Sequence, residues 1–342
     1  MKKTIYSLIT LSLVLLCACT NTDMDIEIKK SDPKLVLYCF PNTESDTTII
    51  SLTTSLPLYA GTQIIKMEQQ LIVKNPQITY RVNGQERTVY YTKDRMDNIP
   101  PMSYYVVGNH QPGDQISIDA SAPGYPDIHA ETYIPEMPEV TAFKKAYPVF
   151  HDGSTYDQYH LTLNDKQTED FYAVQAYSIY EYEQYQGIGY GYIDYSASPD
   201  TIYDCHFATI NIDDEPALNP VSTLDDFFDY DNSFFRYFYI FNDDIFGGNQ
   251  YTLRLNMQPQ GFYSDTSGMK PIRAGYQFKL YKITPEYYRF IKSVNDINNN
   301  KLGEIGLAPV NPTLNSVTGG YGVVGGYSVV DYKDMIENDK TN

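Results

Sequence analysis

The chain has 342 residues, of which 42% are hydrophobic and 20% are charged, and its formal net charge is −18. This length allows two domains, and this apolar fraction supports packed cores and excludes a disordered chain. Because so acidic a surface repels nucleic acid and anionic lipid, we exclude nucleic-acid binding and a basic membrane-binding patch.

The first 18 residues have the layout of a bacterial lipoprotein signal peptide. Lys2 and Lys3 precede an apolar run of about twelve residues, which is too short to cross roughly 30 Å of hydrocarbon as a helix. The motif Leu-Cys-Ala-Cys that ends at Cys19 resembles the lipobox, in which a cysteine becomes the lipidated first residue after cleavage. We therefore predict a signal peptide over residues 1–18 and lipidation of Cys19. An ordinary signal that is cleaved without lipidation is the alternative.

Residues 19–32 are predicted to form a lipidated, flexible stalk. Asp23, Asp25 and Glu27 resemble the acidic export signals that send lipoproteins of Bacteroidota to the cell surface. Several acyl chains hold a protein stably at a membrane, and no later stretch reaches eighteen apolar residues. We expect a protein that this lipid alone anchors in the outer membrane, exposed on the cell surface. A periplasmic location is the alternative, and a plain solvated linker is compatible with both locations.

Residues 33–135 are predicted to form an immunoglobulin-like β-sandwich. Short β-branched or aromatic runs alternate here with turn residues, which is typical of such folds. Asn83-Gly84, between two of these runs, predicts a type I′ hairpin, since that turn needs two positive φ angles. The predicted strands are residues 35–40, 47–54, 77–82, 87–91, 103–107, 115–120 and 128–134.

Pro135 and Pro138 mark the predicted domain boundary. Residues 140–332 are predicted to form a second β-rich domain, and residues 333–342 a polar tail. The predicted strands of the second domain are residues 159–163, 171–182, 202–212, 234–241, 250–257 and 276–283.

One amphipathic helix is predicted in the second domain near residues 285–298. Thr284 is suited to the N-cap and Pro285 to the first turn. Apolar and aromatic residues then recur at helical spacing, so one face of the helix should pack on a sheet. These residues are Tyr287, Phe290, Ile291, Val294 and Ile297.

No catalytic constellation is recognisable in the sequence. The five histidines have no metal-binding spacing, and no serine-hydrolase elbow is present. Gly320–Gly325 matches a dinucleotide-binding motif by letter, but no helical pattern follows it. A glycine-rich closing strand or turn is the preferred interpretation. We therefore predict a protein that is not an enzyme and that uses no metal or cofactor.

Two sets of residues allow two interpretations each. The acidic clusters Asp213–Glu215, Asp225–Asp231 and Asp243–Asp244 could bind calcium but lack EF-hand spacing, so a solvated acidic face is preferred. Cys39 and Cys205 could pair in an oxidising compartment or remain two separate thiols.

A tyrosine-rich stretch around Gly187 and Gly189 is the main candidate for binding. Aromatic side chains on a glycine-flexed loop could stack on sugars or contact a protein partner. The alternative is a hairpin whose tyrosines pack on the sheet. The candidate binding surface consists of Tyr177, Tyr180, Tyr182, Tyr185, Tyr190, Tyr192 and Tyr195.

The order of several motifs resembles one known family. These motifs are Pro33–Leu37, Phe241–Gly248, the helix start Thr284–Tyr288, and the closing glycine pattern within Asn311–Tyr327. Together they look like the Bacteroidota lipoprotein family called "domain of unknown function 4249", over roughly residues 31–332. The resemblance implies an envelope lipoprotein, often encoded beside TonB-dependent outer-membrane transporters, with no established catalytic residues.

From the lipid anchor, the acidic tyrosine-rich β surface and this resemblance, we expect a non-enzymatic accessory or binding component of a TonB-dependent uptake system. Its expected partners are the membrane, through the lipid on Cys19, and a TonB-dependent outer-membrane barrel. The alternative is a structural or adhesive surface module without a transporter partner.

Overall fold

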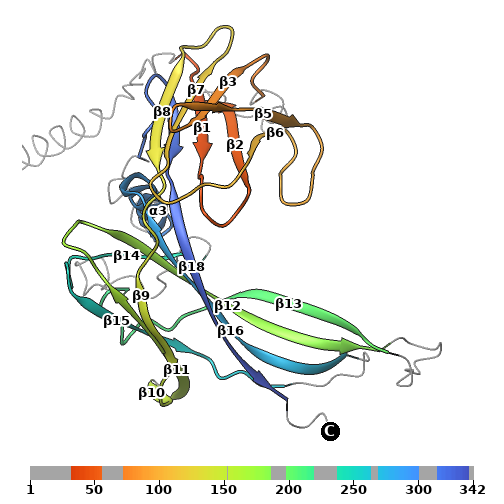
Figure 1. The fold of residues 1–342 in the computed structure, drawn as a ribbon, viewed down its shortest axis with the longest axis vertical. Helices are drawn as coiled ribbons and strands as arrows, with labels where there is room; N and C mark the ends of the chain where they lie inside the picture. The colour runs from red at the N-terminus through yellow and green to blue at the C-terminus, as the bar shows by residue number, and fades with distance from the viewer. Residues whose placement is uncertain are drawn as a thin grey trace, which may run out of the picture.

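The computed structural model describes residues 32–55, 72–151, 153–185, 198–218, 237–262, 269–299 and 314–338. These residues are mostly β-strand, as the sequence predicts, and they form four sheets and one helix. The sheets make two units along the long axis of the molecule, with the N-terminal unit drawn at the top of Figure 1.

The N-terminal unit is a β-sandwich of two sheets. One sheet has the strand order β17-β1-β2-β6-β5, and the other has the order β4-β3-β7-β8. Alternate residues point inward, so Leu35 and Leu37 of β1 share one core with Ile116 and Ile118 of β7. The immunoglobulin-like character of this sandwich stays a prediction. The strands are β1 (Leu35–Cys39), β2 (Thr47–Thr54), β3 (Gln77–Val82), β4 (Gln85–Arg87), β5 (Val89–Thr92), β6 (Ser103–Val107), β7 (Gln115–Ser121), β8 (Ile128–Tyr133) and β17 (Tyr321–Val324).

The predicted hairpin at Asn83-Gly84 is confirmed, because the φ angles of these residues are 51° and 78°. The turn joins β3 to the short strand β4. The single strand predicted over residues 87–91 is corrected, because Thr88 lies between β4 in one sheet and β5 in the other. Residue pattern alone does not reveal that neighbouring residues pair in different sheets.

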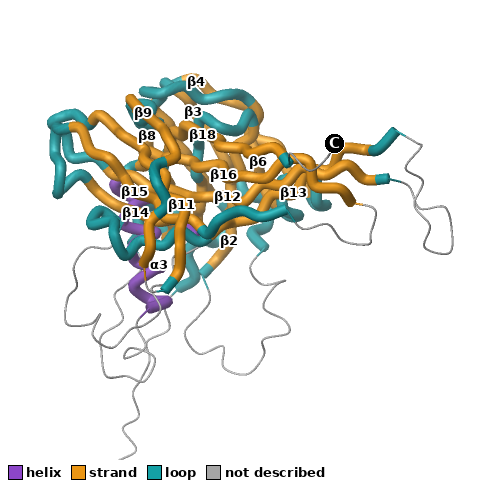
Figure 2. The backbone as a smooth tube through the Cα atoms, turned by 90° about the horizontal axis from the view of Figure 1, so that it is seen from below, coloured by secondary structure: helices purple, strands orange, loops and turns teal. Residues whose placement is uncertain are grey.

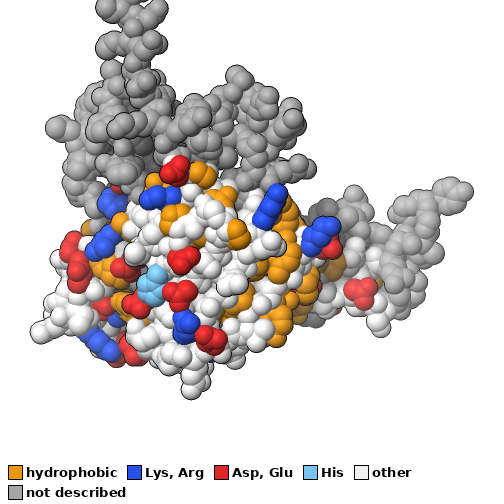
Figure 3. Space-filling view, turned by 90° about the horizontal axis from the view of Figure 1, so that it is seen from above, with side chains coloured by type: hydrophobic (Ala, Val, Ile, Leu, Met, Phe, Trp, Pro, Cys, Tyr) orange, Lys and Arg blue, Asp and Glu red, His pale blue; other side chains and the backbone are white. Residues whose placement is uncertain are grey.

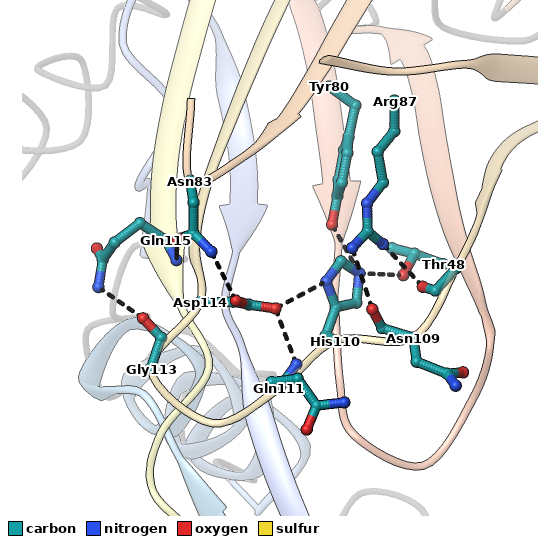
Figure 4. A network of polar contacts seen from close by, with 11 residues as sticks. Thr48, Tyr80, Asn83, Arg87, Asn109, His110, Gln111, Gly113, Asp114 and Gln115 are labelled. Atoms are coloured by element: carbon teal, nitrogen blue, oxygen red, sulfur yellow. Dashed lines mark hydrogen bonds and ion pairs between the residues drawn. The ribbon is translucent and has the colours of Figure 1, made fainter. Parts of the chain in front are cut away.

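A buried histidine connects the two sheets of this sandwich. Nε2 of His110 lies 3.0 Å from Oγ1 of Thr48 on β2 and 3.0 Å from the hydroxyl of Tyr80 on β3. Its Nδ1 is buried without a hydrogen-bond partner among the described residues, and a carboxylate oxygen of Asp114 lies 3.9 Å away (Figure 4). Burial and the charge of Arg87 lower the pKa of His110 to about 4, against the opposing effect of Asp114. The ring is therefore neutral at pH 7.

The second unit also encloses a core between two sheets. One sheet has the order β13-β12-β16-β18, with β14 paired to β12, and the other has the order β10-β11-β15, with β9 paired to β11. Leu161, Leu253 and Phe278 are fully buried between these sheets. The strands are β9 (Val140–Lys145), β10 (Val149–His151), β11 (Ser154–Asn164), β12 (Phe171–Gln184), β13 (Asp200–Ala208), β14 (Tyr239–Asn242), β15 (Gln250–Met257), β16 (Met269–Ile283) and β18 (Tyr327–Glu337).

The predicted helix is confirmed as α3 (Pro285–Asn299). Its residue Ile291 is buried with Phe171 and Ile283, on the face of the β12–β16 sheet that points away from the core of the second unit. Thr284 precedes the helix, but its Oγ1 is buried without a hydrogen-bond partner in the described part of the chain, so the expected side-chain cap is not made. Figure 2 shows the helix near one end of the molecule, with strand β13 and the C-terminus towards the other.

The C-terminal segment joins the two units. β17 pairs in parallel with β1 in the N-terminal unit, and β18 pairs with β16 in the second unit. Only Gly325 and Gly326 separate these strands. Gly322 has a φ of +121°, and a Cβ there would lie 1.9 Å from the carbonyl oxygen of Leu37. The glycine motif is therefore a close-packed closing strand, which confirms the preferred interpretation.

Two predicted boundaries are corrected by these pairings. Residues 321–324 were assigned to the second domain but complete the N-terminal sheet, because their backbone pairs with β1. Residues 333–337 were assigned to a polar tail but complete β18, because their backbone pairs with β16 despite their polar side chains. The predicted signal peptide, and all of the stalk except residue 32, lie outside the described residues.

Candidate functional site

A cavity of about 510 Å³ lies where the two units and helix α3 meet, and we call it the aromatic cavity. Small-molecule sites occur preferentially at such junctions and have volumes of roughly 300–1,000 Å³. The side chains that line it are mostly rings from segments far apart in the chain. They are Tyr38, Phe40, Glu44, Gln175, Tyr177, Phe207, Phe238, Lys279, Tyr281, Tyr287, Phe290, Ile291 and Tyr327.

One wall of the aromatic cavity is formed by helix α3 and the end of β1. The rings of Phe40 and Tyr287 stack with centroids 4.5 Å apart, and Phe290 lies 5.8 Å from Tyr38. The backbone holds this wall in place, because the amide of Tyr327 donates to the carbonyl of Pro41 at 3.1 Å. Ring stacking and a direct contact between the units therefore fix the same region.

The floor of the aromatic cavity is the face of the β12–β16 sheet beyond the helix. Oε1 of Gln175 accepts hydrogen bonds from the hydroxyls of Tyr177 at 3.0 Å and Tyr281 at 2.8 Å. Burial raises the pKa of both tyrosines, so their hydroxyls stay protonated and donate. This cluster fixes the orientation of two rings at the floor.

An ion pair joins the two units across the aromatic cavity. Nζ of Lys279 on β16 donates to Oε1 of Glu44, which lies on the loop between β1 and β2. Burial acts to lower the pKa of Lys279, but the hydrogen bond and charge of Glu44 outweigh it and raise the pKa overall. The ammonium also lies 5.4 Å from the ring centre of Tyr177, a cation–π distance.

The rings continue from the aromatic cavity onto the surface of the sheet. Phe207 on β13 lies 5.0 Å from Tyr177 and 5.7 Å from Tyr237, and both Phe207 and Tyr237 are exposed. A ligand could thus contact exposed rings before it reaches the buried ones. The arrangement offers binding surface, and Glu44 is the single carboxylate among the described lining residues, so the lining supplies no carboxylate pair.

A smaller, polar cavity of about 290 Å³ lies on the outer face of the N-terminal unit. Nδ1 of His129 lies 2.7 Å from Asp119, and its Nε2 lies 3.3 Å from Glu131. The hydrogen bond with Asp119 raises the pKa of His129.

Figure 3 shows charges of both signs interspersed over the described surface seen from above, with a band of hydrophobic side chains along one side.

The structure separates the tyrosines that were predicted to form one binding surface. Tyr177 lines the aromatic cavity, whereas Tyr180 and Tyr182 stack on each other at 6.0 Å on the opposite face of β12. The hydroxyl of Tyr185 donates to Glu183 at 3.0 Å. Tyr190, Tyr192 and Tyr195 lie outside the described residues, as does Cys19.

Sequence reasoning missed most residues of the aromatic cavity. Tyr287, Phe290 and Ile291 were recognised as the apolar face of the helix, but only as a packing face. Lys279 and Gln175 gave no signal, because each is a single polar residue between two apolar neighbours in its strand. Alternation along β16 could have placed Lys279 and Tyr281 on one face, but not in a cavity.

In two of the acidic clusters, a described carboxylate accepts hydrogen bonds that hold the fold together. Glu215 is fully buried, and its carboxylate accepts from the amide of Arg254 at 2.7 Å and the hydroxyl of Tyr251. Asp243 accepts from the amide of Asp170 at 3.0 Å. No group of three metal-binding side chains occurs within the described ranges.

Cys39 and Cys205, the cysteines of the described residues, are both free thiols. Cys39 lies in the N-terminal core, where burial raises its pKa far above the ordinary value. Cys205 is exposed on β13. The two are therefore separate thiols in the structure, which was one of the two interpretations.

These features define a mostly β protein of two joined units with an aromatic cavity between them. None of the helices in the described residues has the length and apolar character needed to cross a membrane. The chain belongs to the family described as Domain of unknown function (DUF4249), whose model matches residues 21–333. No curated protein matches the chain.

Proposed function

We propose that this protein is a lipid-anchored outer-membrane lipoprotein that binds a small ligand in the aromatic cavity as a non-enzymatic accessory of a TonB-dependent uptake system. The observation that carries the binding role is the cavity itself, about 510 Å³ of mostly aromatic surface between two units. The lipobox at Cys19 supports the anchor, and the resemblance to a lipoprotein family often encoded beside TonB-dependent transporters supports the link to uptake.

The preformed lining supports binding of a small molecule. Stacked rings and the cluster around Gln175 already hold the aromatic side chains in place, so little side-chain entropy is lost when a ligand enters. The link between the units is also continuous in the backbone, through β17 and β18. Because the lining residues come from both units, a ligand would contact both at once.

Native mass spectrometry of the protein purified from its own cell envelope tests the binding role. We expect a small molecule to co-purify with the wild-type chain and to be lost in Tyr177→Ala. Tyr180→Ala is the matched control, since Tyr180 lies on the same strand but on the opposite face. Equal loss in both variants, or no bound molecule in any, would contradict the binding role.

Mild crosslinking and co-purification with a tagged copy test the uptake role. A TonB-dependent barrel should be recovered with the wild-type chain and with both tyrosine variants. If no barrel is recovered, and binding to cells or matrix survives deletion of any neighbouring transporter, the chain is a structural or adhesive module instead.

A further inference from the structure

We propose that the aromatic cavity binds a flat, ring-containing organic anion, with its rings among the aromatic side chains and its anionic group at Nζ of Lys279. This inference rests on the binding role proposed above and adds the chemical class of the ligand.

The lining favours planar rings over polyhydroxylated compounds. Phe40 and Tyr287 present stacked rings on one wall, and Tyr177 and Phe207 present rings 5.0 Å apart on the sheet. Aromatic rings pack on other rings in offset or edge-to-face arrangements. Oε1 of Gln175 already accepts two tyrosine hydroxyls. A sugar would therefore find many rings but few polar groups that are not already engaged.

The charge of the ligand is argued from Lys279. Among the described lining residues it is the one cation, and it lies within the long strand β16 with 20% of its side chain exposed. Glu44, its partner, lies on a loop with 38% of its side chain exposed. An anionic group can therefore take the place of Glu44 at Nζ while the Glu44 carboxylate turns to water. A buried ammonium left without any anion would be strongly unfavourable.

The net negative charge of the chain does not prevent an anion from binding in the aromatic cavity. The formal net charge is −18, but charges on the surface are screened over about 8 Å at physiological salt. A direct contact with a largely buried ammonium is screened much less, and charge-assisted hydrogen bonds are among the stronger ones. The surface therefore repels anions in general, and the aromatic cavity accepts one at a defined atom.

Two probes of nearly the same shape test the inference: 2-naphthalenesulfonate, an anion, and 2-naphthalenesulfonamide, its neutral counterpart. Binding is measured by isothermal titration on residues 19–342, with Cys19→Ser in every variant so that no detergent is needed. We expect the anion to bind about tenfold more tightly than the amide, which a single charge-assisted hydrogen bond can provide. Lys279→Gln should reduce that preference to about twofold or less. Glu44→Gln should strengthen binding of the anion, because it removes the competing carboxylate.

Lys145→Gln is the matched control. Nζ of Lys145 lies 2.7 Å from Asp157 and 5.7 Å from the ring centre of Tyr159, so it repeats the contacts of Lys279 outside the aromatic cavity. This variant should keep the full preference for the anion. Melting temperatures check that each variant folds. If Lys279→Gln does not fold, the affinity of Glu44→Gln for the anion still tests the inference.

Equal binding of both probes, unchanged by Lys279→Gln, would overturn the anionic class and leave the binding role standing. Weaker binding of the anion in Glu44→Gln would overturn it as well. Failure of both probes to bind would also overturn it, while the co-purified molecule in the native mass spectrum decides the binding role separately.

Discussion

Acidification should destabilise the N-terminal sandwich through His110. Its pKa is about 4 in the folded protein, against 6.5 for the unperturbed side chain, because burial and Arg87 disfavour the charged ring. Below pH 6.5 the unfolded chain binds a proton that the folded chain does not. The stability that comes from this group is therefore complete above pH 6.5 and is lost as the pH falls towards 4.

The size of this effect follows from the shift of the pKa. Each unit corresponds to about 1.4 kcal/mol, so protonation of His110 should remove about 3 kcal/mol between pH 6.5 and 4. That is a large part of the 5–15 kcal/mol that typically stabilises a domain. Below pH 4 the loss from this residue should stop, because both states are then protonated.

Amide hydrogen exchange in β2 and β3 is the suitable assay, because it reports the opening free energy of this sandwich alone. His110→Gln should lose less stability than the wild type between pH 6.5 and 4, and the difference should be about 3 kcal/mol. The comparison uses the slope of the opening free energy against pH, so a loss of stability from the substitution at pH 7 does not affect it. His206→Gln, an exposed histidine in the other unit, should keep the wild-type slope. Identical slopes for wild type and His110→Gln would refute the reasoning.

Three further substitutions have defined outcomes. Gly322→Ala should lower the free energy of unfolding by about 2 kcal/mol or more, since its Cβ would meet the Leu37 carbonyl. The control Gly84→Ala, with open space around it, should lower it by about 1 kcal/mol. Equal losses in denaturant titrations would contradict this packing. Glu215→Ala should lower the free energy of unfolding by about 3 kcal/mol, because two backbone amides and the Tyr251 hydroxyl lose their acceptor. The control Asp213→Ala, at the exposed end of the same cluster, should lower it by less than about 0.5 kcal/mol. A reversed order of melting temperatures would show that the buried carboxylate is not structural. Cys19→Ser should release the chain from the membrane fraction and abolish labelling with radioactive fatty acid, and a variant that stays membrane-bound would show that another anchor exists.

Much of the fold could be predicted because its signals are local. The Asn83-Gly84 turn depends on two φ angles, and the face of α3 depends on the spacing of residues such as Ile291. Runs of β-branched and aromatic residues mark most strands. The sequence pattern failed where pairing is not local, as at residues 321–324 and 333–337, which join sheets with partners far away in the chain.

Only a small part of the candidate site could be predicted from the sequence. Tyr177 was recognised among seven tyrosines, but the period of two in a strand separates it from Tyr180 and Tyr182. The ion pair of Lys279 with Glu44 spans 235 positions, so no local pattern contains it.

The sequence by itself therefore determined the mostly β class, the helix and the family, since each depends on neighbouring residues or on motif order, and it predicts the lipid anchor. Only the tertiary structure decided that β1, β12, β16, α3 and β18 meet around one aromatic cavity. The reason is physical: burial assigns a face to each strand or helix, but the packing of the two units against each other determines which faces enclose a space and which rings line it.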